Sequence, residues 1–397
     1  MSEVENIPKH WRVKKLGEVC DIKGGKNQSN VINPNGKYPI YGSSGIFGYA
    51  DEYLCDEHTT IIGRKGTINS PIYVTTKFWN VDTAFGLCSK ADLNSKFLYF
   101  FCLGFNFHKL DKSTTIPSLA KRDLQSIDIP LPPFHEQLSI VSKIEELLSD
   151  LENGKQQLLI AQQQLKIYRQ SLLKWAFEGR FGFAQRPSNS TKEGDLPKGW
   201  FVKKLSEIGT WKGGGTPSKS RNDFWENGNI LWVSPKDMKS QKIFDTIDKI
   251  TSDAIENSST KLISKGSVLF VVRSGILRRT LPVALTITDV TVNQDIQALT
   301  PINVIPEYVY LYVCAKNDDI RKTCSKDGTT VESIESQLLK HYSIPLCSLQ
   351  EQQFIVDELE SKLTVCDKIE ETISQSLLQA ESLRQSILKK AFEGKLV

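Results

Sequence analysis

The chain has 397 residues, of which 39% are hydrophobic and 24% are charged. This composition is typical of a folded protein with two or three domains, and it excludes a fibrous or largely disordered chain. No apolar run reaches the length of a membrane span and the N-terminus lacks the apolar core of a secretory signal, so we expect a cytoplasmic protein without a membrane partner. Eight cysteines are scattered without a C-x-x-C pair, which indicates reduced thiols rather than a zinc site or a disulfide framework.

The net charge is only +4, but its distribution along the chain is uneven. Residues 1–132 carry 16 Lys and Arg against 13 Asp and Glu, and residues 196–344 carry 20 against 16. Residues 133–180 balance at 6 against 6, whereas residues 345–397 are acidic at 6 against 9. The positive excess therefore lies in two separate blocks, which is compatible with nucleic-acid binding but does not establish it.

The first block, residues 1–132, is predicted to be a globular domain of mixed strands and helices. TTIIGRKGTINSPIYV at 59–74 has β-branched runs broken by glycine, which predicts strands joined by turns. KFLYFFCLGFNFHKL at 96–110 predicts a short buried helix. The order of the strands does not follow from these patterns.

Residues 133–180 are predicted to form one long helix. No proline interrupts the chain between Glu136 and Gly179, and apolar residues recur at seven-residue steps. The repeating row is Ile144, Leu151, Leu158, Leu165 and Leu172. A companion row begins four residues earlier, at Ile140, and includes Tyr168 and Trp175. Two such rows are typical of a coiled-coil seam, and the helix would be about 65 Å long.

The same plan then returns after a polar linker at 181–195 that is rich in Gly, Pro and Ser. Residues 196–347 predict a second domain of mixed strands and helices. Residues 348–397 predict a second long helix whose apolar row includes Leu359, Ile373 and Ile387.

The two halves share their beginnings and their ends. IPKHWRVKKLGEVCDIKGG at 7–25 matches LPKGWFVKKLSEIGTWKGG at 196–214, and LPPFHEQLSIVSKIEELL at 131–148 matches LCSLQEQQFIVDELESKL at 346–363. RQSLLKWAFEG at 169–179 and RQSILKKAFEG at 384–394 are identical at nine of eleven positions. These matches indicate a tandem duplication with divergent interiors. Two matching helices favour pairing with each other over the alternative, ordinary helix packing inside a globular core.

Motifs of catalysis are missing. The chain has no G-x-x-x-x-G-K-[ST] phosphate loop. SPKDMK at 234–239 contains the Asp-x-Lys of many nucleases without a second carboxylate at a convincing spacing, and LPPF at 131–134 differs from the Asn-Pro-Pro-Phe/Tyr loop of amino-methyltransferases at Leu131. The five histidines are isolated from one another. We therefore expect no catalytic residue, no metal and no cofactor in this chain.

Binding is the remaining role, and the candidate residues lie in glycine-punctuated turns. Flexible backbone combined with Lys, Arg, Asn, Gln, Ser and Thr suits contacts to phosphates and to base edges, although each cluster alone is also typical of a solvated loop. The candidates in the first block are Lys23, Lys26, Asn27, Gln28, Ser43, Ser44, Arg64 and Lys65. Those in the second block are Lys212, Thr216, Lys219, Arg221, Lys236, Arg273, Arg278 and Arg279.

The order of these motifs resembles the specificity subunit of type I restriction–modification systems. The order is P-x-x-W-x-V-K-K-L, a divergent block, I-P-L-P-P-x-x-E-Q and a long helix that ends in A-F-E-G, followed by the same cycle again. The resemblance covers the whole chain. It implies an α+β architecture in which two target-recognition domains each bind half of a split sequence in double-stranded DNA.

The resemblance also implies partners. The two long helices would pair as an antiparallel coiled coil, fix the spacer between the half-sites and recruit two methyltransferase (modification) subunits. S-adenosylmethionine would be bound by these subunits, whereas ATP and Mg would be bound by restriction (translocase) subunits. The alternatives are the recognition subunit of a methylation-only or related phage-defence system, a single-chain adenine methyltransferase, and a coiled-coil assembly protein without a role in nucleic-acid binding.

Overall fold

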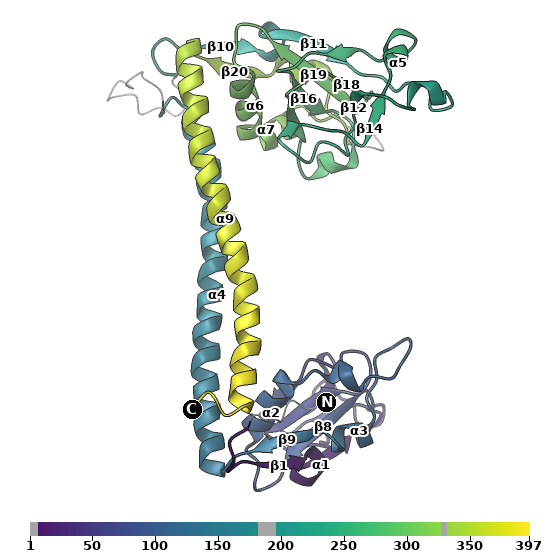
Figure 1. Ribbon diagram of the computed structural model, residues 1–397, viewed down its shortest axis with the longest axis vertical. Helices are drawn as coiled ribbons and strands as arrows, with labels where there is room; N and C mark the ends of the chain where they lie inside the picture. Colours follow the sequence, from purple (N-terminus) through teal and green to yellow (C-terminus); the bar gives the residue numbers. More distant parts are fainter. Residues whose placement is uncertain (1–6, 182–195, 327–331) are drawn as a thin grey trace. The chain divides into compact units, whose positions relative to one another are not determined.

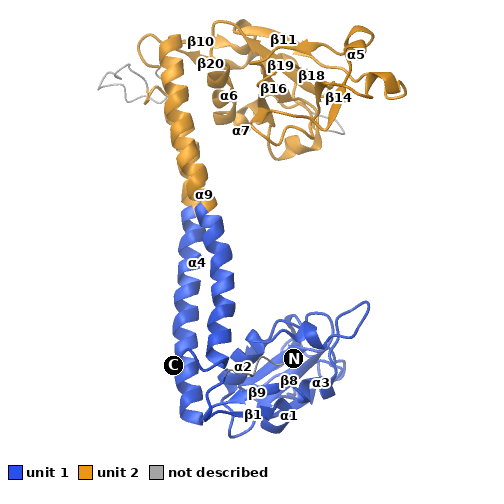
Figure 2. Ribbon diagram, viewed as in Figure 1, with its two compact units in different colours: residues 1–161, 372–397 blue, residues 162–371 orange. Residues whose placement is uncertain are grey.

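The computed structural model describes residues 7–181, 196–326 and 332–397, so all of the predicted linker after Phe181 lies outside the described residues. The chain divides into two compact units (Figure 2). Unit 1 comprises Met1–Ala161 and Thr372–Val397, and unit 2 comprises Gln162–Glu371. Each unit includes part of both long helices, which the sequence alone presents as separate segments.

Unit 1 contains two small sheets and a closing strand pair (Figure 1). The first sheet is antiparallel, with the order β2–β8–β5–β6 (Cys20–Gly24, Ala84–Ser89, Thr59–Gly63, Ile72–Val74). The second has the order β4–β3–β7 (Gly45–Ala50, Tyr38–Gly42, Trp79–Asn80), with β3 and β7 parallel. The helical segments are α1 (Leu16–Val19), α2 (Ser95–Gly104), η1 (Phe107–Leu110) and α3 (Lys121–Gln125).

Unit 2 repeats this plan with larger sheets, of five and four strands instead of four and three. One sheet has the order β11–β19–β16–β17–β13 (Gly209–Gly213, Ile296–Pro301, Val268–Val271, Val283–Thr286, Lys242–Ile243). The other has the order β14–β12–β18–β15 (Asp248–Ile250, Ile230–Val233, Val290–Val292, Leu262–Ile263), with β12 and β18 parallel. The helical segments are η2 (Leu205–Glu207), η3 (Asn222–Phe224), α5 (Ser252–Glu256), η4 (Gly275–Arg278), α6 (Pro306–Ala315), α7 (Asn317–Thr323) and α8 (Ser336–His341).

The duplicated opening and closing motifs pair with each other. In unit 1, β1 (Arg12–Lys15) is antiparallel to β9 (Asp128–Leu131), and in unit 2, β10 (Phe201–Lys204) is antiparallel to β20 (Ser343–Leu346). The register is the same, because the first residue of each opening strand faces the last residue of each closing strand. The two repeated motifs therefore close each domain and leave the divergent residues between them.

The Glu-Gln of the closing motif ties each long helix to a short buried one. Gln137 is fully buried, and its Oε1 accepts a hydrogen bond from the Asn94 amide at the start of α2 (2.8 Å). Gln352 accepts the equivalent bond from the Ile305 amide at the start of α6 (3.0 Å). Each glutamine thus satisfies a helix N-terminal amide that would otherwise be buried without a partner.

The long helices α4 (Phe134–Phe177) and α9 (Leu349–Phe392) have 44 residues each and lie side by side within each unit (Figure 1). Ion pairs between the helices show that the two run antiparallel, because residue numbers rise along α4 as they fall along α9. Lys155 pairs with Glu381 in unit 1, and Arg169 pairs with Asp367 (2.7 Å) and Glu370 in unit 2. The predicted α+β class with an antiparallel helix pair is confirmed.

The predicted apolar row lies along this seam. Ile144, Leu165 and Leu172 are buried in α4, as are Leu359, Ile373 and Ile387 in α9, while Leu151 and Leu158 are half-buried.

The companion row is wrong in the middle of α4. Tyr168 is 45% exposed, and in the corresponding row of α9 Ile369 is 44% exposed. The residues that reach the partner helix lie four positions after the apolar row rather than before it, as Lys155 and Arg169 do. Charged side chains at these positions hide the seam from a pattern of apolar residues alone.

The repeated A-F-E-G phrase ends each helix against the opening of the other half. Gly179, at the end of α4, has φ +72°, and a Cβ there would lie 2.0 Å from Pro197 Cγ. Gly394, at the end of α9, has φ +66°, and its Cβ would lie 2.3 Å from Pro8 Cγ. Only glycine fits a left-handed helix end packed this closely on a proline ring.

We expect Gly394→Ala to lower the free energy of unfolding of unit 1 by more than about 1 kcal/mol, because alanine has an unfavourable φ there and its Cβ overlaps Pro8. The control is Gly154→Ala in the middle of α4, where nothing lies within 4 Å of the added Cβ. This control should raise stability by about 0.5–1 kcal/mol. Chemical denaturation of both variants measures the difference, and equal effects would contradict the packing described.

Candidate nucleic-acid interface

The predicted turns of unit 1 converge on one segment, residues 80–84, which we call hub 1. Hub 1 joins β7 to β8 and carries the sequence NVDTA. Three backbone hydrogen bonds attach the turns to it: Lys26 N to Asn80 O (3.0 Å), Val81 N to Tyr41 O (3.0 Å) and Arg64 N to Thr83 O (2.7 Å). The structure therefore brings together the turns at 23–28, 43–44 and 64–65.

Unit 2 has the same arrangement around residues 292–296, which we call hub 2. Hub 2 carries the sequence VNQDI and joins β18 to β19. Its three bonds are Gly215 N to Val292 O (3.0 Å), Asn293 N to Val233 O (2.9 Å) and Val272 N to Asp295 O (2.8 Å). The turns that contain Thr216, Lys236 and Arg273 therefore meet there.

These bonds align the two interiors residue by residue where their sequences have diverged. Lys65 forms an isolated bridge with Ser118, and Arg273 forms one with Ser333, which is the equivalent serine of the duplication. By the same pairing, Ser44 corresponds to Lys236. One backbone frame thus presents different side chains in the two units.

Several candidate side chains of unit 1 have internal roles. Lys23 Nζ pairs with Asp56 Oδ2 (3.2 Å), and Asn27 Oδ1 accepts a hydrogen bond from the Ser29 amide (2.8 Å). The buried Cys55 thiol nearby donates to Asn80 Oδ1 (3.2 Å) in hub 1. Arg64 is exposed, and its Nη1 donates to the Asp82 carbonyl (3.3 Å).

The β3–β4 hairpin presents exposed apolar side chains that are absent from the predicted set of DNA-contacting residues. Ile46 and Phe47 directly follow the Ser43–Ser44 turn, and each is 52% exposed. Their ring and methyl groups can contact thymine methyls. The sequence signal, two consecutive large apolar residues after a glycine-containing turn, is also typical of an ordinary edge strand.

Unit 2 likewise uses part of its candidate set internally. Lys212 Nζ donates to the Leu262 carbonyl (3.1 Å), and Thr216 bonds Gln294 in hub 2. Arg221 pairs with Asp223 and covers the Phe224 ring at 3.8 Å, so it stabilises its own loop.

The Asp-x-Lys of SPKDMK is a structural turn. Asp237 accepts hydrogen bonds from the amide and the hydroxyl of Ser234 (2.8 Å each) and from the Ile247 amide (2.9 Å). The carboxylate is thus engaged by the protein, while Lys236 beside it is exposed. Within residues 7–181, 196–326 and 332–397, no group of three or more His, Cys, Asp and Glu residues is placed to hold a metal ion, and no helix could cross a membrane.

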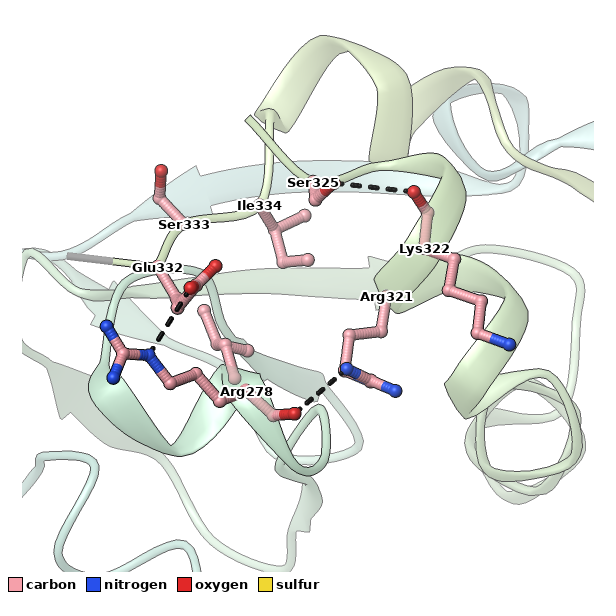
Figure 3. Close-up of a pocket in the computed structure, with 8 residues that line it drawn as sticks. Arg278, Arg321, Lys322, Ser325, Glu332, Ser333 and Ile334 are labelled. Atoms are coloured by element: carbon pink, nitrogen blue, oxygen red, sulfur yellow. Dashed lines mark hydrogen bonds and ion pairs between the residues drawn. The ribbon is translucent and has the colours of Figure 1, made fainter. Parts of the chain in front are cut away.

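A cationic pocket of about 370 Å³ is lined by residues that include Arg278, Arg321 and Lys322 (Figure 3). Ser333, which also lines it, forms the bridge with Arg273. Arg278 Nε pairs with Glu332 Oε1 (3.3 Å), and Arg321 Nη1 donates to the Arg278 carbonyl (3.0 Å). Lys322 extends away from Glu332 (Figure 3), whereas Arg279 does not line the pocket. Sequence reasoning missed Arg321 and Lys322, because they follow two aspartates in a helix that appears charge-balanced.

Comparison with known proteins identifies the family of this chain. The family model for the type I restriction modification DNA specificity domain matches the chain twice, at residues 8–160 and 197–379. The EcoR124I/EcoR124II specificity subunit of Escherichia coli is 37% identical over 64% of this chain, and the match spans 59% of that relative's length. The EcoDI specificity subunit of Escherichia coli is 23% identical over 98% of this chain and 89% of its own.

Solved structures share the fold. The HsdS subunit from Thermoanaerobacter tengcongensis superposes with a TM-score of 0.66 at 20% identity, over 98% of both chains. A chain from a study of complex assembly and conformational transition of the type I restriction–modification system gives 0.76 at 20% identity, over 98% of this chain and 99% of its own. Because the family model matches most of the chain, once in each half, this protein belongs to the type I restriction–modification DNA specificity family.

Proposed function

We propose that this chain reads a split sequence in double-stranded DNA, one half-site with each unit, in the cytoplasm. The observation that carries this proposal is the repetition of one backbone frame around hubs 1 and 2 with different side chains at equivalent positions. A shared frame gives each unit the same way of approaching DNA, and different side chains give each unit its own sequence.

The chemistry of the turns supports DNA as the ligand. Exposed Arg64, Lys236 and Lys322 carry no carboxylate partner within 4 Å among the described residues, so their charges are available to phosphates. Backbone amides and short polar side chains in the same turns suit base edges in the major groove. Phosphate contacts would position each unit, and base contacts would specify the half-site.

We assign catalysis to partner subunits. Two methyltransferase subunits would supply S-adenosylmethionine and methylate adenine, and restriction subunits would supply ATP- and Mg-dependent translocation and cleavage. Support comes from Asp237, which is part of the nuclease-like sequence SPKDMK, because its oxygens are bound by Ser234 and Ile247.

We expect the purified chain to transfer no methyl group to DNA, and the chain mixed with its modification subunits to methylate adenine within one split motif. Transfer of a labelled methyl group from S-adenosylmethionine measures both. The control is the modification subunits without this chain, which should show no sequence preference. Methyl transfer by this chain alone would contradict the assignment.

We expect Lys322→Ala to weaken binding of the assembled complex to all duplexes by a similar factor. Loss of one phosphate contact also lowers the slope of log affinity against log salt by about one unit. Lys203→Ala is the matched control, because Lys203 is exposed on β10 and does not line the cationic pocket. If Lys322→Ala behaves like the control, the cationic pocket does not touch the DNA backbone.

We further propose that the helix pair sets the spacer between the half-sites. Supporting this, α4 and α9 are each continuous over 44 residues, or about 66 Å, and each begins in one unit and ends in the other. A continuous helix resists changes in length, whereas a flexible tether would accept many spacers.

We therefore expect four residues inserted after Gln162 to lengthen the preferred spacer by about one or two base pairs, since the helix gains about 6 Å and each base pair rises about 3.4 Å. Such an insertion is a stutter that a coiled coil absorbs by local unwinding. Four residues inserted within 182–195 are the control and should leave the spacer unchanged. Long-read sequencing of methylated adenines reports the motif. A changed half-site with an unchanged spacer would refute the proposal that the helix pair sets the spacer.

A further inference from the structure

The backbone on both sides of Arg273 is held by hydrogen bonds, through Val272 and Ser274. Arg273 lies two residues after the end of β16 and forms a bridge with Ser333, and its neighbour Val272 donates its amide to the Asp295 carbonyl (2.8 Å). The side chain is held as well, because Arg273 Nε donates to Asp295 Oδ1 at 2.7 Å.

Asp295 is itself fixed within hub 2. Its Oδ2 accepts a hydrogen bond from Asn293 Nδ2 (3.2 Å), and its amide donates to Asn293 Oδ1 (3.0 Å). The Asp295 side chain is 20% exposed, whereas that of Arg273 is 57% exposed. In the described part of the chain, Asp295 is the one residue that hydrogen-bonds or pairs with the Arg273 side chain. The guanidinium is therefore anchored through Nε, and its two Nη groups remain for a ligand.

We propose that Arg273, aligned by Asp295, reads a guanine in the half-site bound by unit 2. Guanine presents two acceptors, O6 and N7, on its major-groove edge, and a planar guanidinium can donate to both at once. Because the orientation is already fixed in the protein, less side-chain freedom is lost on binding. This inference rests on the proposed function and adds to it the base and the residue that reads it.

The net charge of the Arg273–Asp295 pair favours guanine over phosphate as the ligand. A carboxylate 2.7 Å from the guanidinium offsets its positive charge, so attraction to an anionic phosphate is weakened. The neutral acceptors of guanine are affected far less. Asp295 therefore favours base reading over backbone contact.

The described residues of unit 1 contain no equivalent arginine–carboxylate pair at this position. Lys65 is the structural equivalent of Arg273, and Thr83 is the equivalent of Asp295, by the backbone bonds that align the two hubs. A lysine without a carboxylate partner offers a mobile point charge instead of an oriented pair of donors. The guanine reader therefore belongs to one half-site only, and Lys65→Ala is a matched control.

The test uses the complex of this chain with its modification subunits and duplexes in which each base pair of the motif is replaced in turn. With wild-type chain, one half-site should contain a guanine whose replacement weakens binding roughly 5- to 150-fold. Arg273→Ala should abolish this discrimination at that base pair alone. Lys65→Ala should leave the same half-site unchanged.

Asp295→Asn tests the positioning role, because it removes the charge and keeps the size. We expect it to reduce discrimination at the same base pair, and we expect Arg273→Ala combined with Asp295→Asn to lose no more than Arg273→Ala alone. Independent, additive losses would show that Asp295 does not act through Arg273. Melting temperatures close to wild type for Arg273→Ala would show that an exposed side chain was removed without unfolding unit 2.

Three results would overturn the inference while the proposed function stands: a split motif without guanine in either half-site, unchanged discrimination in Arg273→Ala, or uniform weakening on all duplexes with a salt slope lower by about one. The last result would identify Arg273 as a phosphate contact. A complex that shows no split motif at all would instead refute the proposed function, and the inference with it.

Discussion

The structure depends on an exchange of helix ends between the two halves of the sequence. Phe177, at the end of α4, packs against Tyr308 and Tyr312 of unit 2, with ring centroids 5.1 Å apart in each case. Phe392, at the end of α9, packs in the same T-shaped way against Phe97 and Phe101 of unit 1. Each core is therefore completed by a helix that begins in the other unit. Large aromatic side chains contribute heavily to such cores, so neither half of the duplication is complete alone.

The residues that hold the fold together are thus separate from the residues that differ between the two halves. The paired motifs, the buried glutamines and the helix ends hold each unit closed, and all of them lie outside the hubs. At the hubs the frame is made of backbone hydrogen bonds, which do not depend on side-chain identity. The equivalent positions can consequently be Lys and Thr in one unit and Arg and Asp in the other without loss of the fold. Such a division allows the recognised sequence to change while the architecture is kept.

Much of the fold follows from the sequence, because periodicity and repetition depend on neighbours along the chain. The duplication, both long helices and the apolar row through Leu172 and Ile387 are all readable in this way. The hubs are not, because Lys26 and Asn80 are 54 residues apart whereas Gly215 and Val292 are 77 apart. No fixed spacing links the turns that meet. Residue type also fails to separate exposed donors from internal ones, as Arg221 shows by pairing with Asp223.

Partly buried carboxylates hold the turns of the second interior in place. Asp237 and Asp295 are both partly buried, yet the first fixes a turn and the second aligns an arginine. Asp237 accepts three hydrogen bonds from the protein and Asp295 accepts two, so both carboxylates are held in place by their neighbours. Hydrogen bonds of this kind make the recognition surface more rigid. Under the proposed function the reactive groups are carried by other subunits, so each DNA-reading turn can diverge without disturbing an active site.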